Sequence, residues 1–453
     1  MAAASVSDLA ARFSAEAPRI REELEQLVRI PSVSFAEFDP DGLQQSATAT
    51  AEILERSGWT GVRFLESDGA PPAVYAACDG PAGAPTVLLY AHHDVQPPGP
   101  AEAWDSPPFQ PVVRGGRLYG RGTADDKAGI VVHAAALRAH GGRPPVSVRV
   151  LIEGEEEIGS PHLTPFLDRF ADDLRADVIV LADNPNWRRG VPSLTTSLRG
   201  LFDCVVELRV LDHGVHSGEF GGPVVDALTS LCRLLATLHH HDGTVAVDGL
   251  GGTPGPELDM TVDEFRAVAG VRPGVRLVGY GSITGRLWTR PAVSVLGIDA
   301  PAVNVASNQL VPVARALVSV RTPPDDDPAA GLRALTDHLH ANAPWGAEVT
   351  ITPGRQVLGA GTTIETNGGA YDAARRALGE AWDTEAVEIG GGGGIPFVTE
   401  FAAAFPRASL LLTGVADPDS RLHAENESVD LEELRRACLA EALLLTYLAH
   451  PDP

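Results

Sequence analysis

The sequence predicts an α/β protein of two domains, in which an α/β domain carries an inserted α+β domain. Three observations lead to this prediction. Helical and extended patterns alternate along the first half of the chain, as is typical of an α/β sheet. Three apolar strands in that half each end in histidine or acidic residues. At 453 residues the chain is also too long for one ordinary core, which favours two domains.

The first part of the α/β domain is expected to span residues 1–194. Apolar residues at helical spacing, bounded by proline or glycine, predict helices, and short apolar runs predict strands. The expected helices are 7–30, 43–57 and 128–139, and the expected extended segments are 61–65, 73–77, 86–91, 146–152 and 177–182.

His92 and Asp94 directly follow the strand 86–91. Residues two apart on a strand share a face, so these two side chains point the same way. The arrangement suits a histidine that binds a metal while a carboxylate fixes its tautomer and ring orientation. A polar loop at the end of a strand is the alternative interpretation of the same residues.

Acidic residues occupy comparable places elsewhere in this domain. The run 153–157 follows the strand 146–152, and Asp183 follows the strand 177–182. Asp125 and Asp126 precede the helix 128–139, where an acidic residue either caps the helix or binds a ligand, or one of the pair does each.

These side chains are expected to converge, because ligands bind at the carboxyl ends of strands in open α/β sheets. A site rich in carboxylates, with few imidazoles and no thiolate, suits Zn²⁺, Mn²⁺ or Co²⁺. The number of acids indicates two ions, since a single zinc ion rarely takes more than four protein ligands.

The inserted domain is expected over residues 195–355, and the α/β domain is expected to resume over 356–453. The insert carries an alternating strand, a helix and a Gly- and Pro-rich span before further elements, without acidic strand ends. Its expected elements are strands 201–210, 314–320 and 347–352 and helices 223–238 and 329–342, and the last part has helices 371–382 and 430–448 and strands 386–389 and 409–412. Five glycines, 390–394, form either a flexible hinge or a place where a substrate approaches bare backbone.

Composition excludes several classes of partner. The formal charge is −25 and no basic cluster stands out, so nucleic acid and anionic membrane surfaces are not expected partners. No apolar run approaches the roughly 20 residues that cross a bilayer, and the first residues lack the pattern of a signal peptide. The four cysteines are widely scattered, so we expect neither a disulfide framework nor a zinc knot. A cytoplasmic location is expected for the same reason.

Six motifs in sequence order carry a family resemblance. They are His92-x-Asp94-Val-Gln-Pro, Gly120-Arg121-Gly122-x-x-Asp125-Asp126-Lys127, Glu156-Glu157-x-Gly-Ser, Asp183-Asn184, His216-Ser217-Gly218 and His423-Ala-Glu-Asn-Glu. In this order and spacing the chain resembles the M20 metallopeptidase family, and within it the dipeptidase branch that includes carnosinase-like enzymes. The resemblance extends from about residue 86 to the last helix.

The resemblance implies roles for these residues. His92 would bind one ion, His423 the other, and Asp125 would bridge both. Glu157 and Asp183 would complete the two coordination spheres, and Asp94 would orient His92. Glu156 would act as the general base, and the peptide bond between Asp125 and Asp126 would be cis.

Further residues are implicated in the inserted domain and the glycine tract. In the resembling family, the histidine at His216 completes the active site of a partner subunit, which implies a homodimer; a surface loop histidine is the alternative. Arg321 resembles the arginine that binds the terminal carboxylate of the substrate, although it could also be a surface charge at a strand end. Gln309, Gly393 and Gly394 are further candidates for substrate binding, and Gly394 stands where this branch commonly has serine.

The expected function is therefore hydrolysis of the peptide bond in dipeptides or short peptides with a free carboxylate. Two divalent metal ions, most simply zinc, with manganese or cobalt as alternatives, would activate water, and Glu156 would act as the base. An N-acyl-amino-acid deacylase on the same scaffold and a non-catalytic peptide-binding protein are the alternatives.

Overall fold

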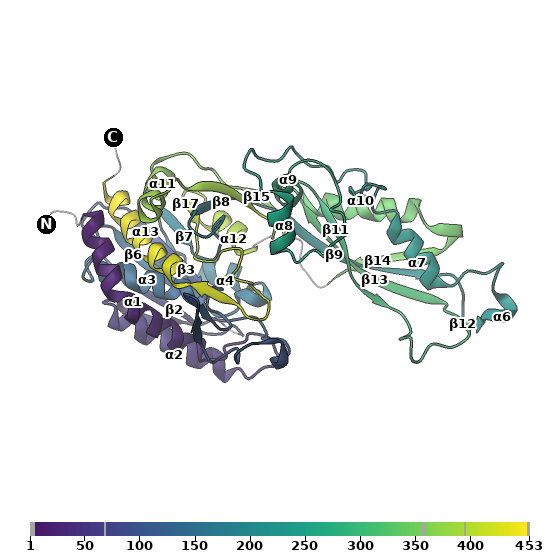
Figure 1. Ribbon diagram of the computed structural model, residues 1–453, viewed down its shortest axis with the longest axis horizontal. Helices are drawn as coiled ribbons and strands as arrows, with labels where there is room; N and C mark the ends of the chain where they lie inside the picture. The colour runs from purple at the N-terminus through teal and green to yellow at the C-terminus, as the bar shows by residue number, and fades with distance from the viewer. Residues whose placement is uncertain (1–4, 68, 355–358, 394–395, 451–453) are drawn as a thin grey trace. The chain divides into compact units, whose positions relative to one another are not determined.

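A computed structural model describes residues 5–67, 69–354, 359–393 and 396–450 (Figure 1). The chain forms two compact units. The first comprises Met1–Thr196, Ile364–Ile389 and Pro396–Pro453, and the second comprises Ser197–Thr363 and Gly390–Ile395. Both units combine helices with sheet, which confirms the α/β fold class expected from the sequence.

The first unit is built on a large mixed sheet with the strand order β1-β2-β6-β3-β7-β17-β8. Its four central strands, β6, β3, β7 and β17, run parallel to one another, so their carboxyl ends meet at one edge. The strands are β1 (Thr60–Leu65), β2 (Ala73–Cys78), β3 (Thr86–His92), β6 (Ser147–Glu153), β7 (Val178–Leu181), β8 (Ser193–Leu198) and β17 (Ser409–Leu412), and β16 (Val387–Gly391) also pairs with β8.

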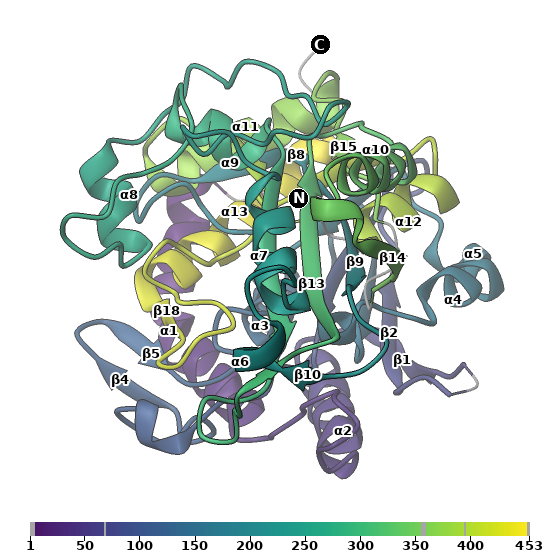
Figure 2. The same ribbon diagram turned by 90° about the vertical axis from the view of Figure 1, so that its right-hand side faces the viewer.

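Helices cover both faces of this sheet (Figures 1 and 2). On one face, Gly129 of α3 lies so close to β3 that a Cβ atom there would be 3.0 Å from the Cβ of Ala91. On the other face, the preceding residue, Tyr90, packs against Phe397 and Phe401 of α12, with ring centroids 4.8 and 5.3 Å away. The α3 face also carries α1 (Val6–Val28), α2 (Asp41–Arg56), α11 (Gly369–Trp382) and α13 (Leu431–Ala449) around α3 (Lys127–Ala139), whereas α12 (Pro396–Ala404) packs with α4 (Leu163–Arg169), which α5 (Ala171–Leu174) follows.

Helix α1 illustrates how local sequence determines these elements. The Ser5 side chain accepts a hydrogen bond from the Asp8 amide, and the Asp8 carboxylate accepts one from the Ser5 amide, which forms a capping box. Apolar residues at helical spacing are buried along one face: Leu9, Phe13, Ile20, Leu24, Leu27 and Val28. This face packs on α3 and α13, so burial of the apolar stripe stabilises the helix.

A small antiparallel sheet in the same unit joins two distant loops. Strand β18 (Ser428–Asp430) pairs with β5 (Arg117–Tyr119), which pairs with β4 (Val112–Arg114). The loop after β5 leads to Asp125, and the loop before β18 contains His423. The pairing therefore brings two candidate metal-binding segments together although about 300 residues of sequence separate them.

The second unit is an α+β structure with an antiparallel sheet in the order β11-β13-β9-β14. Alternate residues of β9 and β13, such as Phe202 and Val318, face a core covered by α7 and α10 (Figure 2). Its main elements are β9 (Gly200–Arg209), α7 (Ala227–Ala236), β11 (Ala292–Asp299), β13 (Val313–Thr322), α10 (Pro328–Ala341) and β14 (Glu348–Pro353). Shorter elements are β10 (Val215–His216), α6 (Ser217–Phe220), α8 (Val262–Val268), α9 (Ile283–Trp288), β12 (Gln309–Leu310) and β15 (Thr362–Thr363).

Several elements differ from the sequence prediction. Helix α7 begins at Ala227, after Asp226 caps it, and not at Pro223 as expected. Strands β8 and β11 and helix α12 were not predicted. The segment of α12 directly follows the glycine tract, and its apolar residues Phe397 and Phe401 fill the core beside Tyr90, so only tertiary packing distinguishes it as a helix.

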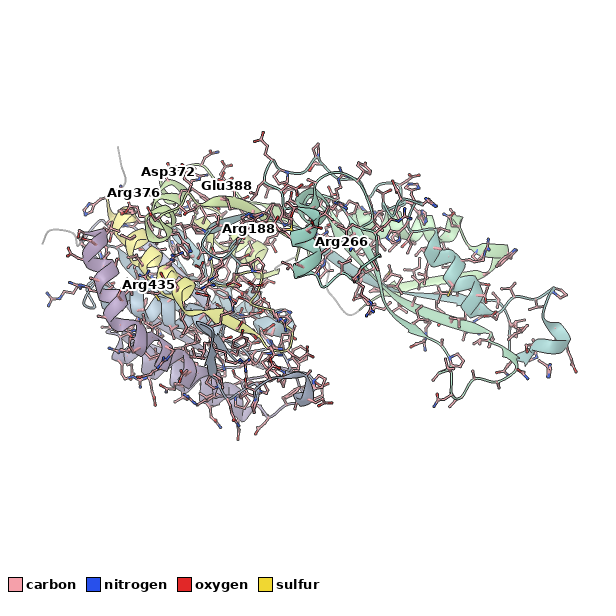
Figure 3. The ribbon with its side chains drawn as sticks, viewed as in Figure 1. Arg188, Arg266, Asp372, Arg376, Glu388 and Arg435 are labelled. Atoms are coloured by element: carbon pink, nitrogen blue, oxygen red, sulfur yellow. The ribbon has the colours of Figure 1, made fainter. Side chains whose placement is uncertain are left out.

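Charged side chains lie along the outer helices of the first unit (Figure 3). Asp372 and Arg376 project from α11, and Arg435 projects from α13. Asp372 is 75% exposed and pairs with Arg375 at 3.2 Å, the kind of solvated contact that contributes little to stability. Within the part of the chain that the structure describes, no helix has the length and apolar character needed to span a membrane.

Candidate metal centre

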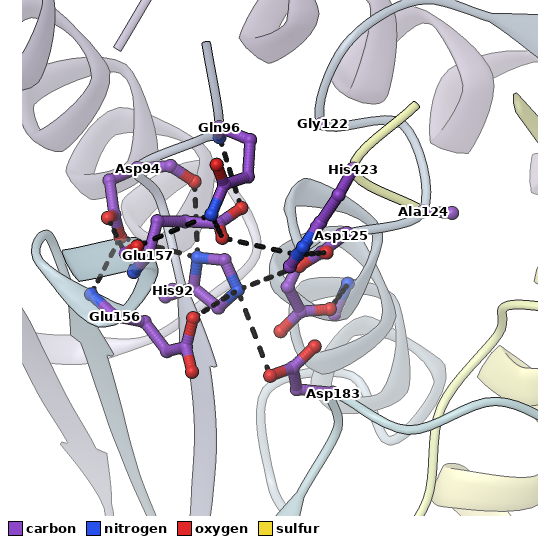
Figure 4. A network of polar contacts seen from close by, with 12 residues as sticks. His92, Asp94, Gln96, Gly122, Ala124, Asp125, Glu156, Glu157, Asp183 and His423 are labelled. Atoms are coloured by element: carbon purple, nitrogen blue, oxygen red, sulfur yellow. Dashed lines mark hydrogen bonds and ion pairs between the residues drawn. The ribbon is translucent and has the colours of Figure 1, made fainter. Parts of the chain in front are cut away.

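Candidate ligands gather in the first unit beyond the carboxyl ends of β3, β6 and β7 (Figure 4). His92 is the last residue of β3 and pairs with Glu153 at the end of β6. Glu156 and Glu157 follow in the next turn, a short 3₁₀ helix, and Asp183 lies two residues beyond β7. Parallel strands in register thus bring carboxylates and an imidazole to one place.

His92 lies at one end of this cluster and is fully buried. Its Nε2 atom is 3.1 Å from Oδ1 of Asp125 and 3.9 Å from Oδ2 of Asp183. Oε2 of Glu156 lies 4.0 Å from the same nitrogen. Ligand atoms of His92, Glu156 and Asp183 all lie within 4.8 Å of one another, a spacing suitable for a metal ion.

The other end of the cluster contains His423 and Glu157. The Nε2 atom of His423 is 2.9 Å from Oδ2 of Asp125 and 3.3 Å from Oε2 of Glu157. The two oxygens of the Asp125 carboxylate therefore each face a different histidine, His92 on one side and His423 on the other. The His423 side chain is 58% exposed whereas His92 is buried, so the cluster opens to solvent on the His423 side. The peptide bond between Asp125 and Asp126 is cis, as the family resemblance implies.

Asp94 organises the turn that carries the two glutamates. Its Oδ1 accepts a hydrogen bond from the Glu156 amide at 3.2 Å, and its Oδ2 accepts one from the Glu157 amide at 3.1 Å. The Nδ1 atom of His92 lies 3.3 Å from Oδ1 of Asp94 but 3.1 Å from the Asp94 backbone carbonyl. Both the backbone carbonyl and the carboxylate of Asp94 therefore orient the His92 ring. The amides of Glu156 and Glu157 are held by the Asp94 carboxylate.

Two further residues support the cluster and were not assigned from the sequence. The Gln96 side chain donates to Oε2 of Glu157 at 2.8 Å, and the Gln96 amide donates to Oε1 at 3.1 Å. Glu427, the last residue of the His423 motif, is fully buried and accepts hydrogen bonds from the loop that precedes Asp125. Both residues stand within recognised motifs, but the sequence contains no signal for the partners that they contact.

The electrostatics of the cluster favour added positive charge. Burial raises the pKa of Glu156, Glu157 and Asp183 well above their usual values, and neighbouring carboxylates add to this effect. Burial alone would lower the pKa of His92, but its contacts with Asp125 and Asp94 raise it well above the usual value.

In the described part of the chain, neither lysine nor arginine balances these carboxylates. Among the described residues, no lysine or arginine forms an ion pair with Asp125, Glu157 or Asp183. A carboxylate-rich donor set with two imidazoles and no thiolate suits divalent ions such as zinc, manganese or cobalt. The residues present therefore fit the two-ion centre that the resemblance implies.

The remaining candidate residues belong to the second unit. His216 ends β10 and pairs with Gln309 of β12, and its Nδ1 accepts a hydrogen bond from the Gly218 amide at 3.1 Å. Arg321 lies near the end of β13, where burial lowers its pKa, and its side chain makes no hydrogen bond or ion pair within the described residues. Gly393 is exposed, and Gly394 lies outside the described residues.

Arg199 is a third residue that the sequence analysis did not identify. Its Nε donates to the Gly392 carbonyl at 3.0 Å, and its amide donates to the Gly391 carbonyl at 3.2 Å. Burial lowers its pKa to about 10, with a further contribution from the positive charge of Arg321. The buried guanidinium of Arg199 thus contacts the backbone of the glycine tract and lies near Arg321.

Comparison with known proteins identifies the family. The model of peptidase family M20/M25/M40 matches residues 88–446. The chain is 33% identical over 440 residues to a cysteinylglycine-S-conjugate dipeptidase from Corynebacterium striatum, with 95% of each chain covered. It is 28% identical over 382 residues to a Beta-Ala-His dipeptidase from Rattus norvegicus, which covers 80% of this chain and 76% of that one.

The fold is also that of solved relatives. The structure of the di-peptidase Dug1p from Saccharomyces cerevisiae matches with a TM-score of 0.82 at 24% identity, and the match covers 99% of both chains. Human carnosine dipeptidase 1 matches with a TM-score of 0.81 over 99% of both chains. The family resemblance inferred from the six motifs is confirmed, and the chain is a metallopeptidase that belongs to peptidase family M20/M25/M40.

Proposed function

We propose that this protein is a metal-dependent dipeptidase, which hydrolyses the peptide bond of dipeptides or short peptides with a free terminal carboxylate. The names of its relatives support this proposal, because two of them, at 33% and 28% identity, are named dipeptidases. The deacylase and the peptide-binding alternatives are not favoured by any of these relatives. The observation that carries the proposal is the Asp125 carboxylate, whose two oxygens face two different histidines.

The proposed centre holds two divalent ions that share Asp125. His92 and Asp183 would hold one ion, and Glu157 and His423 would hold the other. Zinc is the proposed metal, with manganese and cobalt as chemically suitable substitutes. When bound, such ions lower the pKa of water and polarise the carbonyl of the scissile bond.

Glu156 is the proposed general base. Its carboxylate lies within the cluster, 4.0 Å from Nε2 of His92, while Asp94 holds its backbone amide. Burial raises its pKa, so the carboxylate binds a proton readily and can pass it on to the leaving amine. The two neighbouring glutamates thus have different proposed roles. Glu157 faces His423 as a candidate ligand, and Glu156 acts as the base.

Arg321 is proposed to bind the terminal carboxylate of the substrate. Its guanidinium is partly desolvated and, among the described residues, unpaired, which suits a planar carboxylate partner. Gln309 and the glycine tract at Gly393 and Gly394 are proposed to contact the substrate as well. The glycine at 394 removes a hydroxyl common in this branch, so the side-chain preference is expected to differ from that of its relatives.

A homodimer is part of this proposal, with His216 completing the site of the partner subunit. The second unit exposes apolar side chains along its edge strand β11 and the loop that follows. Leu296 is 61% exposed, Val303 96% and Val305 70%. Exposed apolar residues beside an unpaired strand edge favour association with another chain, and a two-fold dimer would bury the same surface on both subunits. A cytoplasmic location is also proposed, which is consistent with four unpaired cysteines.

Glu156→Gln tests the proposed function. We expect turnover of a dipeptide panel to fall about 10²- to 10⁴-fold, the usual contribution of a general base, while the ion content stays unchanged. Glu155→Gln is the matched control, because the neighbouring Glu155 is also buried but hydrogen-bonds to His162 outside the cluster. Full activity in Glu156→Gln, or no hydrolysis by the metal-loaded wild-type protein, would contradict the proposal.

A further inference from the structure

Glu427 occupies an unusual position beside the candidate metal centre. Its carboxylate is fully buried and accepts four hydrogen bonds. Oε2 accepts from Nη1 of Arg121 at 2.6 Å and from the Gly122 amide at 2.9 Å. Oε1 accepts from the Ala124 amide at 2.9 Å and from the Asp125 amide at 3.3 Å. Three of the four donors are therefore backbone amides of the loop that ends in Asp125.

The same residue also fixes the loop that carries His423. Strand β18 begins at Ser428, directly after Glu427, and pairs with β5, so the two loops leave the small sheet side by side. His423 and Asn426 both have positive φ angles, of 61°, in the left-handed region that few non-glycine residues adopt. Asn426 accepts a hydrogen bond from the Asp105 amide and donates one to the Ala103 carbonyl. The end of the His423 loop is thus anchored to Ala103 and Asp105 through Asn426, and to the Asp125 loop through Glu427.

A purely stabilising role for the Arg121–Glu427 ion pair is the simpler explanation. Buried ion pairs often contribute little net stability, because desolvation offsets the attraction between the charges. The first unit contains a second example, in which Glu23 pairs with Arg138 at 3.0 Å and both side chains are buried. Among the described residues Glu23 accepts no hydrogen bond from a backbone amide, whereas Glu427 accepts three from the loop that ends in the candidate ligand Asp125.

We propose that Glu427 is a positioning residue for the metal centre, because it holds the Asp125 loop and the His423 loop at the spacing that the shared ion site needs. This inference rests on the proposed function, in which Asp125 and His423 are ligands of one ion. Outer partners that hold ligands in place commonly change metal affinity about 10- to 100-fold when they are removed. The effect should be largest for the ion between Glu157 and His423, since both loops contribute to that site.

The test is Glu427→Gln, with Glu23→Gln as the matched control. A glutamine at position 427 keeps the shape of the side chain, but its NH₂ group must face either Arg121 and the Gly122 amide or the amides of Ala124 and Asp125. Both substitutions remove one buried carboxylate from an ion pair with arginine. Zn²⁺ affinity and stoichiometry are measured by competition with a chromophoric chelator on ion-free protein, so the readout does not depend on turnover.

We expect wild-type protein and Glu23→Gln to bind two ions with affinities that agree within about threefold. In Glu427→Gln, the more weakly bound ion, which we assign to the site between Glu157 and His423, should bind about 10- to 100-fold less tightly than in wild type. Two tightly bound ions in Glu427→Gln would overturn the positioning role and leave the proposed function intact. No ion binding by the wild-type protein would instead refute the proposed function.

A second variant covers the case in which Glu427→Gln does not fold. Glu427→Asp keeps the charge but withdraws the carboxylate by one methylene from Arg121 and from the amides of the Asp125 loop. We expect the weaker ion to bind about tenfold less tightly in this variant. Wild-type ion affinity in a folded Glu427→Asp variant would overturn the proposal.

Discussion

Asp94→Asn separates the two tasks of Asp94, orientation of His92 and support of the turn that carries Glu156 and Glu157. Asparagine keeps one oxygen but replaces the other with an NH₂ group that cannot accept a hydrogen bond. In the wild-type protein both oxygens are used, because Oδ1 accepts from the Glu156 amide and Oδ2 from the Glu157 amide. One amide must therefore lose its acceptor in the variant, and both lie in a buried region.

The size of the effect follows from this loss. Leaving one buried donor without a partner costs about 1–3 kcal/mol. If this cost falls on the ion-binding conformation, ion affinity drops about 5- to 150-fold, since about 1.4 kcal/mol corresponds to a factor of ten. The His92 ring should keep its orientation, because its Nδ1 atom lies closer to the Asp94 backbone carbonyl, at 3.1 Å, than to the carboxylate, at 3.3 Å.

The assay is competition between the ion-free protein and a chromophoric chelator for Zn²⁺, with turnover of a dipeptide measured in parallel. Asp430→Asn is the control, because Asp430 is also buried but accepts both of its backbone amides on Oδ1, which asparagine retains. We expect weaker ion binding in Asp94→Asn and nearly unchanged binding in Asp430→Asn. An Asp94→Asn protein that binds ions as tightly as wild type would refute the reasoning.

Three other predictions concern the proposed partner subunit, the substrate and the response to pH. His216→Ala should depress turnover far more than ion content, and mixing it with a Glu156→Gln protein should restore partial activity through hybrid dimers; no rescue under confirmed subunit exchange would argue against a shared site. Arg321→Ala should raise KM for peptides with a free carboxylate and leave amidated analogues unaffected, so equal loss on both would exclude carboxylate binding. Burial raises the pKa of Glu153 from 4.5 to about 7, so this carboxyl keeps its proton in the fold while the unfolded chain loses it. The ion-free protein should therefore lose up to about 3 kcal/mol of stability between pH 4.5 and pH 7, and Glu153→Gln should flatten that part of the thermal unfolding profile; an unchanged profile would contradict the shift.

The convergence of the candidate ligands was easier to predict from the sequence than the complete set of helices and strands. The strands β3, β6 and β7 are buried on both faces, so each appears as a short apolar run, and the chemistry at their ends is conspicuous. Strand β11 escaped prediction because its later residues are exposed and a bulge at Leu296 interrupts its pairing with β13. Helix α12 was not predicted because the pattern of its apolar residues does not distinguish a helix from a strand. Their packing against Tyr90 is visible only in the structure.

The supporting residues of the site could not be predicted for a different reason. Gln96 and Glu427 act on partners that are 61 and about 300 residues away in the sequence. Any residue except proline can donate a hydrogen bond from its backbone amide, so the identity of the donor residue does not reveal the contact. The roles of these residues therefore become visible only when the small sheet brings the two loops together.

The central claim is that two neighbouring ions share Asp125. Its most direct test is anomalous diffraction from crystals grown with Zn²⁺ or Mn²⁺. We predict two anomalous peaks about 3.5–4 Å apart, the usual spacing in two-metal sites, one beside His92 and Asp183 and the other beside Glu157 and His423, with Asp125 contacting both. A single peak, or peaks away from these side chains, would contradict the account.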